Sequence, residues 1–275
     1  MCRHLAYLGP EEPIGRILVD PPHSLYRQSW APRRQRYGTV NADGFGVGWY
    51  APGDPVPARY RRAGPIWADA SFADLARVVR TGALLAAVRD ATLPGADGEA
   101  AAAPFVGDRW LFSHNGAVAG WPASAAPLVP VLPPVEMLSL AARSDSAFVW
   151  ALLLHRLRAG EDPGQALVGT VRGLAEAAPA SRLNLLLTDG TTILATAWGD
   201  TLWYRAEPGG TVVASEPYDD DPRWQEVPDR ALLGADRTEV RLSSLNDSRP
   251  WPVTRRAQVH ARPRAGRPAQ GEVPS

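Results

Sequence analysis

Cys2 is the only cysteine of the 275-residue chain, and it stands directly after the initiator methionine. Removal of Met1 would leave this residue with a free α-amine beside its thiol. An α-amine with a pKa of about 7.7–8.0 can accept the proton of a thiol whose ordinary pKa is about 8.5. The pair could therefore attack a carbonyl carbon without a histidine or aspartate partner. The alternative is that Cys2 is a small buried hydrophobic residue, as free cysteines often are.

Asn115 and Gly116 occur in the stretch SHNGAV, after an apolar segment that begins at Trp110. The side-chain amide of Asn115 and the backbone N–H of Gly116 could donate hydrogen bonds to one oxygen atom. Two such donors form an oxyanion hole for a tetrahedral intermediate. Asn-Gly is also a strong signal for a hairpin turn. The pattern therefore predicts a turn at the end of a strand, with or without a catalytic role.

Arg89 and Asp145 could bind the two charges of a zwitterionic substrate. Arg89 ends an apolar run, where a guanidinium must pair with an acid or face a cleft because burial of a lone charge is costly. Its planar fork suits a carboxylate, although the adjacent Asp90 could be an internal partner. Asp145 lies in the first turn of a predicted helix, where the helix dipole favours an acid regardless of function. The sharper hypothesis is that Asp145 receives a substrate ammonium group.

The elements that must position these residues are predicted from apolar periodicity and turn residues. We expect strands at residues 2–8, 45–49, 84–89, 110–114, 183–187, 191–198, 201–205 and 211–214, and helices near 72–79, from Ser144 to Gly160 and over 164–177. Asp69 or Ser71 is the expected N-cap of the first helix. Segment 10–36 is expected to be loop with one helical turn at most. This order predicts an α+β fold with mostly antiparallel sheets.

Composition excludes several classes of protein. The 29 basic residues balance the 29 acidic ones, so no overall charge favours nucleic acid or an anionic membrane as a partner. One cysteine excludes an internal disulfide framework and a cysteine-based zinc cluster. No signal stretch and no apolar run of membrane-spanning length are found, so we expect a cytoplasmic protein. Residues 2–247 are expected to form one domain and residues 248–275, which are rich in Pro and Arg, a disordered tail.

Together these residues resemble the class II glutamine amidotransferase superfamily, whose nucleophile is an N-terminal cysteine. The resemblance is carried by the stretches MCRHLAYLG, PRRQRYGTVNADGFGVGWY, FSHNGAV, RSDSA, LNLLLTDG, TAWGDTLWYR and VVASEP. NADGFGVGWY and TAWGDTLWYR are more similar to the subfamily of amidohydrolases that act on γ-glutamyl-hercynylcysteine S-oxide in ergothioneine biosynthesis. The resemblance implies a four-layer αββα Ntn-hydrolase sandwich with two mostly antiparallel sheets.

The resemblance also implies roles for individual residues. These are Cys2 as nucleophile with its α-amine as base, Asn115 and Gly116 as the oxyanion hole, Arg89 for the glutamyl α-carboxylate, Asp145 for the α-ammonium, and Thr92 as a further residue of the binding pocket. The implied reaction releases glutamate and hercynylcysteine S-oxide through a Cys2 thioester, with no metal and no cofactor. Asp90 stands where many amidotransferases have Trp or His, so its role stays open.

Two other functions agree with the same residues. The first is a glutaminase subunit that supplies ammonia to a synthase, or a hydrolase of another γ-glutamyl peptide. The second is a catalytically silent binding protein that keeps the fold. The partner is expected to be a small γ-glutamyl molecule, and the oligomeric state stays open, with a homodimer as one option.

Three further polar features have simpler interpretations. His4 shares a strand face with Cys2, so it could line the same pocket or only pack beside it. His114 is expected to pack beneath the Asn-Gly turn by strand alternation. The acidic run 219–221 is interpreted as a solvated loop and not as a metal site.

Overall fold

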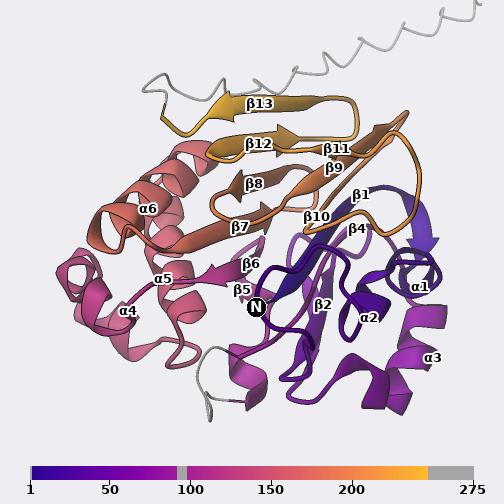
Figure 1. Ribbon diagram of the computed structural model, residues 1–275, viewed down its shortest axis with the longest axis horizontal. Coiled ribbons are helices and arrows are strands. Elements are labelled where there is room, and N and C mark those ends of the chain that lie inside the picture. The colour runs from indigo at the N-terminus through magenta and orange to yellow at the C-terminus, as the bar shows by residue number, and fades with distance from the viewer. Residues whose placement is uncertain (1, 92–97, 247–275) are drawn as a thin grey trace, which may run out of the picture.

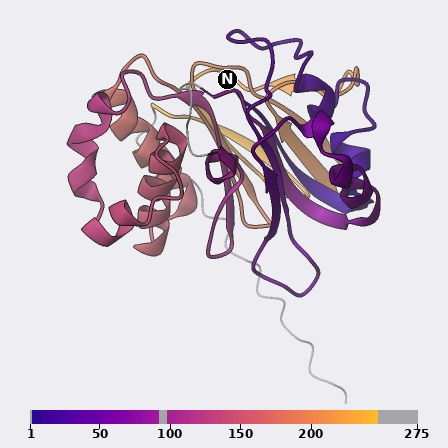
Figure 2. The ribbon, with the colours of Figure 1, turned by 90° about the horizontal axis from the view of Figure 1, so that it is seen from below.

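The computed structural model describes residues 2–91 and 98–246 of the chain. Two antiparallel sheets lie face to face between two layers of helices (Figure 1, Figure 2). The predicted α+β sandwich of four layers is therefore confirmed. Thr92 and the tail 248–275 lie outside the described residues, so the expectations for them stay predictions, as do the domain bounds.

The first sheet has seven strands and carries the N-terminus of the chain. In spatial order they are β11 (Gln225–Glu226), β9 (Trp203–Glu207), β10 (Gly210–Ala214), β1 (Arg3–Pro13), β4 (Arg80–Val88), β2 (Phe45–Trp49) and β3 (Ala58–Arg62). The strand β1 lies in the middle of this sheet, between β10 and β4. The residue that follows Met1 is thereby joined to the centre of the sandwich.

The second sheet has six strands and includes the Asn-Gly segment. In spatial order they are β13 (Val240–Ser244), β12 (Ala231–Ala235), β8 (Ile193–Ala197), β7 (Arg182–Thr188), β6 (Trp110–Ala117) and β5 (Phe105–Gly107). Hairpins join β7 to β8 through Gly190 and β9 to β10 through Gly209, and both glycines have φ near +80°. A positive φ is a backbone conformation that glycine adopts readily.

The helices form the two outer layers of the sandwich (Figure 2). The α-helices are α1 (Ile14–Leu18), α2 (Leu25–Gln28), α3 (Ala70–Val78), α4 (Pro134–Leu138), α5 (Asp145–Arg158) and α6 (Pro163–Ala177), and the 3₁₀ helices are η1 (Ile66–Ala68), η2 (Gly98–Ala101) and η3 (Ala123–Val131). None of the helices found in the described ranges is long and apolar enough to cross a bilayer.

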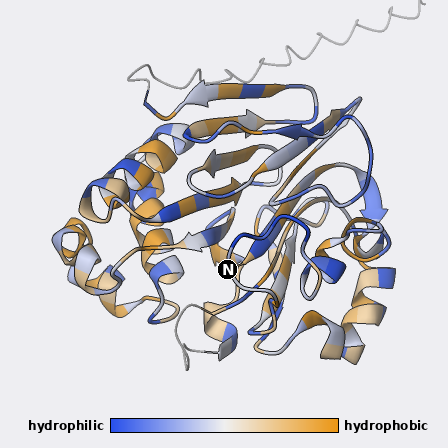
Figure 3. Cartoon of the chain, in the orientation of Figure 1, coloured by the Kyte–Doolittle hydropathy of each residue, from blue (hydrophilic) through white to orange (hydrophobic). Residues whose placement is uncertain are grey.

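Three hydrophobic clusters hold the layers together. One packs α5 and α6 on the second sheet, one packs α1 and α3 on the first sheet, and one fills the space between the sheets. Side chains of β2 alternate between the two faces of the first sheet. Phe45 and Val47 point to the face covered by α1 and α3 and belong to the cluster there. A Cβ at Gly48 would lie 2.5 Å from the Leu111 side chain, so the lack of a side chain there allows the sheets to approach closely. The strands in Figure 3 carry hydrophobic residues interspersed with hydrophilic ones.

Local signals located most elements, and the departures have physical causes. Ser144 caps α5 and Asp69 caps α3, as predicted. The first strand continues through Pro10 to Pro13, because an irregularity between Leu8 and Glu12 keeps it paired with β4. Segment 10–36 therefore contains the end of a strand and two short helices, and the expectation of a loop was wrong for much of it.

Candidate active site

A cavity of about 310 Å³ opens where β1 begins, β4 ends and α5 begins. Four of the six predicted site residues line it: Cys2, Arg89, Gly116 and Asp145. Asn115 is fully buried directly before Gly116. These five residues come from four segments that are far apart in the chain. The structure thus brings together every predicted site residue that it describes.

Cys2 immediately precedes β1 and is partly buried. Burial raises the pKa of its thiol above the ordinary value, and the charge of Asp145 adds to the rise. The Arg89 guanidinium and the backbone N–H of Asp90 oppose it. A thiol in this environment is protonated near neutral pH and needs a base in order to become a nucleophile.

Asn115 and Gly116 lie inside β6 and not in a turn after it. Pairing of β6 with β7 continues to Ala117 and Arg182, so the predicted hairpin turn was wrong. Long-range strand pairing overrides the local Asn-Gly preference here. Glycine is required for a different reason: a Cβ at Gly116 would lie 1.9 Å from the carbonyl oxygen of Arg182.

Ser215 holds the side chain of Asn115 from the neighbouring sheet. The Asn115 amide nitrogen lies 3.3 Å from the Ser215 hydroxyl oxygen, which also accepts a hydrogen bond from the backbone N–H of His4 at 3.0 Å. The amide oxygen of Asn115 is buried and has no hydrogen-bond partner among the described residues. Sequence reasoning missed Ser215, since it is 100 residues away and nothing in its local pattern marks it.

Asp43 positions Arg89 at the end of β4. Asp43 N–H donates to the Arg89 carbonyl at 2.9 Å, and Arg89 N–H donates to the carbonyl of the next residue, Gly44, at 2.7 Å. The guanidinium donates to the carbonyl of Asp43 at 3.2 Å, and the Asp43 carboxylate accepts from Ala91 N–H at 2.7 Å. Asp43 lies in the predicted NADGFGVGWY motif, but the motif alone did not indicate this role.

Asp145 is the first residue of α5, and its carboxylate bridges two segments. One oxygen accepts from the backbone N–H of Val118 at 2.9 Å and the other from Ser146 N–H at 2.7 Å. No arginine of the described ranges lies within 4 Å of this carboxylate as an ion-pair partner. Its charge is stabilised by backbone dipoles and is available to a cationic ligand.

The two histidines near the site do not line the cavity. His4 is fully buried with Nδ1 3.2 Å from the Ser113 hydroxyl, and burial lowers the pKa of His4 to about 3. His114 packs beneath Gly116, between the Ser146 hydroxyl at 3.1 Å and the Arg182 carbonyl at 2.9 Å. The prediction that His114 packs beneath the Asn-Gly segment is confirmed, and His4 is a packing residue.

Three large side chains on the cavity wall were not predicted as site residues: Trp121, Arg143 and Arg182. Arg182 is brought to the site by the β6–β7 pairing, which local sequence does not reveal. Within residues 2–91 and 98–246 no group of three or more His, Cys, Asp or Glu side chains could hold a metal ion.

The arrangement combines a thiol, a buried amide beside a glycine, a cation and an anion around one cavity. Such a set can bind an amino acid by its charged groups and hold a side-chain carbonyl against a sulfur nucleophile.

Comparison with known sequences gives consistent results. The sequence profile of the family "Glutamine amidotransferases class-II" matches residues 19–209. A protein of Mycolicibacterium smegmatis named "Gamma-glutamyl-hercynylcysteine sulfoxide hydrolase" is 44% identical over 247 residues, which are 89% of this chain and 100% of that protein. A protein of the same name from Mycobacterium tuberculosis is 40% identical over 247 residues, 90% of this chain and 97% of its own length.

Solved structures agree on the fold. A "glutamine aminotransferase class-II domain protein" from Silicibacter pomeroyi superimposes with a TM-score of 0.66 at 24% identity. The superposition covers 90% of this chain and 100% of that chain. At this level of identity the likeness supports the architecture alone.

Proposed function

The chain belongs to the class II glutamine amidotransferase family, and on this premise we propose that it is an amidohydrolase that releases glutamate from γ-glutamyl-hercynylcysteine sulfoxide. The observation that carries the proposal is the cavity that gathers Cys2, Gly116, Arg89 and Asp145 around one space. The two mycobacterial relatives are named for this activity and align over nearly their whole length.

Cys2 is the proposed nucleophile and acts after removal of Met1. The freed α-amine takes the thiol proton, directly or through one water, as the sulfur attacks the γ-carbonyl carbon. The raised pKa of the thiol supports the need for such a base. His4 is unsuited to that role, because its buried ring has a pKa of about 3 and lies outside the cavity.

Asn115 and Gly116 are the proposed oxyanion hole. We propose that the Asn115 amide is turned by 180° in the reacting enzyme relative to the orientation described above. Ser215 can then donate its hydroxyl proton to the amide oxygen while it accepts from His4 N–H. The amide NH₂ group is thereby directed to the cavity, where it stabilises the oxygen of the tetrahedral intermediate together with Gly116 N–H.

Arg89 and Asp145 are the proposed binding residues for the glutamyl α-carboxylate and α-ammonium. Both charges are fixed mainly by backbone groups and lie near enough to the thiol to shift its pKa in opposite directions. Collapse of the intermediate expels the amine, which takes the proton held by the α-amine, and leaves a γ-glutamyl thioester. Attack by water on the thioester then releases glutamate and regenerates the thiol.

A substrate panel tests the proposal. Glutamate release is measured with γ-glutamyl-hercynylcysteine sulfoxide, glutathione and glutamine as substrates. We expect kcat/KM for the hercynyl substrate to exceed that for glutamine by at least about 100-fold, because contacts to the leaving amine lower the barrier at the amide. Equal or better turnover of glutamine would contradict the proposal and favour the ammonia-supplying function.

Intact mass tests the processing step on which the mechanism depends. Active enzyme is expected to lack Met1 and to begin at Cys2. Full activity in protein that retains Met1 would refute the α-amine as base.

A further inference from the structure

Arg182 is a second cation on the cavity wall, and it is held in an unusual way. Its guanidinium lies over the ring of Tyr37, with Cζ 4.3 Å from the ring centroid. Its Nε is buried without a hydrogen-bond partner in the described part of the chain. No carboxylate within residues 2–91 and 98–246 forms an ion pair with it. The charge of Arg182 is therefore oriented by an aromatic ring and is not neutralised there.

Tyr37 is itself fixed by its loop. Its carbonyl accepts a hydrogen bond from the Gln35 side chain at 2.9 Å, and Gln35 in turn accepts one from the buried Asn41 at 3.0 Å. The next residue, Gly38, packs so closely on Asp90 that a Cβ would lie 2.2 Å from the Asp90 carboxylate. This hydrophilic segment between α2 and β2 passes beside the N-terminus (Figure 1, Figure 3). The loop that carries the Tyr37 ring, on which Arg182 lies, is thus held beside the cavity.

The charges of the cavity exceed what a glutamyl group needs. Arg89 and Arg182 both lack a carboxylate partner in the described ranges, whereas Asp90 and Arg143, which also line the cavity, have interactions of their own. The glutamyl head brings one carboxylate and one ammonium group, which Arg89 and Asp145 satisfy. A guanidinium that lines a cavity without a carboxylate partner keeps hydrogen-bond donors available for an anionic ligand.

The position of Arg182 in the sheet indicates which part of the substrate supplies that anion. Arg182 pairs with Ala117 across β6 and β7. Its carbonyl oxygen packs against the Cα of Gly116, at the place where a Cβ would stand in any other residue. If Gly116 holds the oxygen of the scissile amide, Arg182 starts one residue further along the same wall. In the leaving amine, the carbon bonded to the amide nitrogen carries a further substituent. An arginine side chain that starts at position 182 is long enough to reach that substituent.

We propose that Arg182, supported by Tyr37, binds the carboxylate of the leaving amine and so selects γ-glutamyl amides of amino acids over γ-glutamyl amides of simple amines. This inference rests on the proposed function, since it assigns the second subsite of the same cavity. The carboxylate concerned is that of the cysteine unit, which is attached to the carbon next to the scissile nitrogen.

Two matched substrates test the assignment. One is the γ-glutamyl amide of S-methylcysteine S-oxide, and the other is the γ-glutamyl amide of S-methylcysteamine S-oxide, which lacks only the carboxylate. Wild-type enzyme is expected to prefer the first by at least about tenfold in kcat/KM, as is typical of a charge-assisted hydrogen bond. In Arg182→Gln this ratio should fall to within about twofold of unity. The backbone contacts of Arg182 with His114 and Gly116 do not depend on its side chain.

Arg230→Gln is the matched control, because Arg230 also lies over an aromatic ring, that of Trp198 at 3.6 Å, but does not line the cavity. It should leave the substrate ratio unchanged. Tyr37→Ala should lower the ratio about two- to fivefold through loss of the cation–π contact, and Tyr37→Phe should restore it.

The outcomes separate the two claims. An equal loss on both substrates in Arg182→Gln, or a wild-type ratio near one, would overturn the subsite while leaving the hydrolase in place. Failure of wild-type enzyme to cleave the hercynyl substrate would overturn the proposed function itself, whereas cleavage of that substrate without cleavage of the S-methylcysteine amide would overturn the subsite alone.

Discussion

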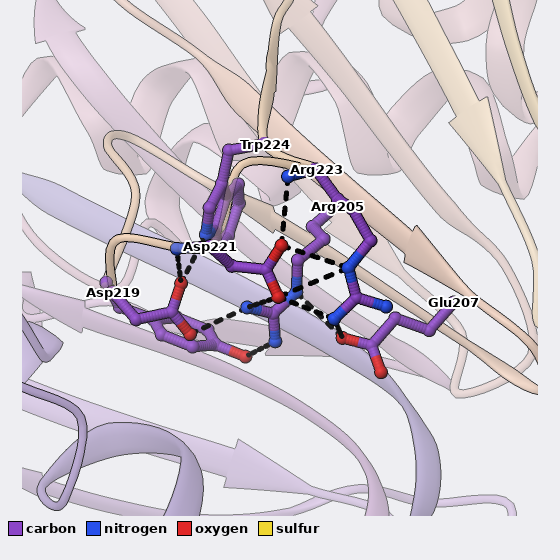
Figure 4. A network of polar contacts seen from close by, with 7 residues as sticks. Arg205, Glu207, Asp219, Asp221, Arg223 and Trp224 are labelled. Carbon is purple, nitrogen blue, oxygen red and sulfur yellow. Dashed lines mark hydrogen bonds and ion pairs between the residues drawn. The ribbon is translucent and has the colours of Figure 1, made fainter.

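Two charged regions of this molecule are built on opposite principles. Arg205 of β9 lies 2.6 Å from an oxygen of Asp219, in the loop after β10, and 2.8 Å from a Glu207 oxygen. It also donates to the Tyr218 hydroxyl at 2.7 Å (Figure 4). Arg223 pairs with Asp221, and its hydrogen bonds lower the pKa of that carboxyl. Each of these charges meets an opposite charge.

The cavity at the start of β1 keeps its charges apart. Arg89 is held by a backbone carbonyl, Arg182 by an aromatic ring and Asp145 by two backbone N–H groups. Among the described residues these three side chains have no partner of opposite charge within ion-pair distance. They are positioned without being neutralised.

The presence or absence of an ion-pair partner therefore distinguishes charges that support the fold from charges that can bind a ligand, even in a chain with zero net charge. Removal of one charge from a compensated network leaves its partner unpaired and lowers stability. Fixed charges without a partner are instead available to bind a ligand of opposite charge. The acidic run 219–221, expected to be a solvated loop, belongs to the first kind, since Asp219 and Asp221 both lie beside Arg205. Substitutions in the cavity should therefore change turnover, and substitutions in the network should change stability.

The largest expected effect is loss of the proposed nucleophile, Cys2. Cys2→Ala should abolish glutamate release while the free energy of unfolding changes by less than about 0.5 kcal/mol, as for a side chain outside the cores. Cys2→Ser should retain little activity. In wild-type protein a glutamine-like diazo ketone should add covalently to the single thiol, and intact mass would show one adduct. Substantial turnover by the alanine variant would remove Cys2 from the mechanism.

The next effect is loss of an oxyanion donor. Asn115→Ala should lower kcat about 10²–10³-fold with little change in KM, because the amide stabilises the transition state and not the bound substrate. Steady-state kinetics with the hercynyl substrate measure both constants. Ser215→Ala, which only orients the amide, should cost about tenfold in kcat. A change confined to KM in Asn115→Ala would make Asn115 a packing residue.

How far the sequence predicts this site depends on the range of the interactions. Local signals located Ser144 as the cap of α5 and placed Asp145 in its first turn. The same local reasoning failed at Gly116, where pairing with β7 replaces the turn. Ser215 and Arg182 reach the site through contacts with residues at least 65 positions away, and no motif of a single segment records such contacts. The strands β12 and β13 were not predicted either. Both depend on long-range pairing, of β12 with β8 and of β13 with β12.

A substitution in the compensated network around Arg205 should lower stability and leave turnover nearly unchanged. Asp219→Asn removes the charge that accepts hydrogen bonds from Arg205 and Trp224, at 2.6 and 2.7 Å. We expect unfolding to become easier by about 2 kcal/mol, with kcat/KM within about twofold of wild type. Urea denaturation and the same kinetic assay measure the two quantities.

Asp74→Asn is the matched control for the network. Asp74 pairs with Arg77 at 3.0 Å, but both side chains are at least 70% exposed. An exposed pair of this kind contributes less than about 0.5 kcal/mol. If both variants lose equal stability, the distinction between the buried network and a surface pair is wrong.

The smallest effect concerns His4, a buried base that has neither an acid partner nor access to the cavity. Its pKa of about 3 in the folded protein lies below the ordinary value of 6.5, so between these values the unfolded chain binds a proton that the native ring does not. Acidification must therefore destabilise the fold. At pH 5.5, one unit below the ordinary pKa, the loss relative to pH 7.5 should be about 1.4 kcal/mol from this residue.

Urea denaturation at the two pH values isolates the contribution of His4. His4→Asn keeps a polar group near the Ser113 hydroxyl but cannot take up the proton, so its stability should fall by about 1.4 kcal/mol less than that of wild type between pH 7.5 and 5.5. An identical pH dependence in wild type and His4→Asn would show that the His4 ring takes up protons in the native state. The inference that burial keeps the His4 ring neutral in the folded protein would then be wrong.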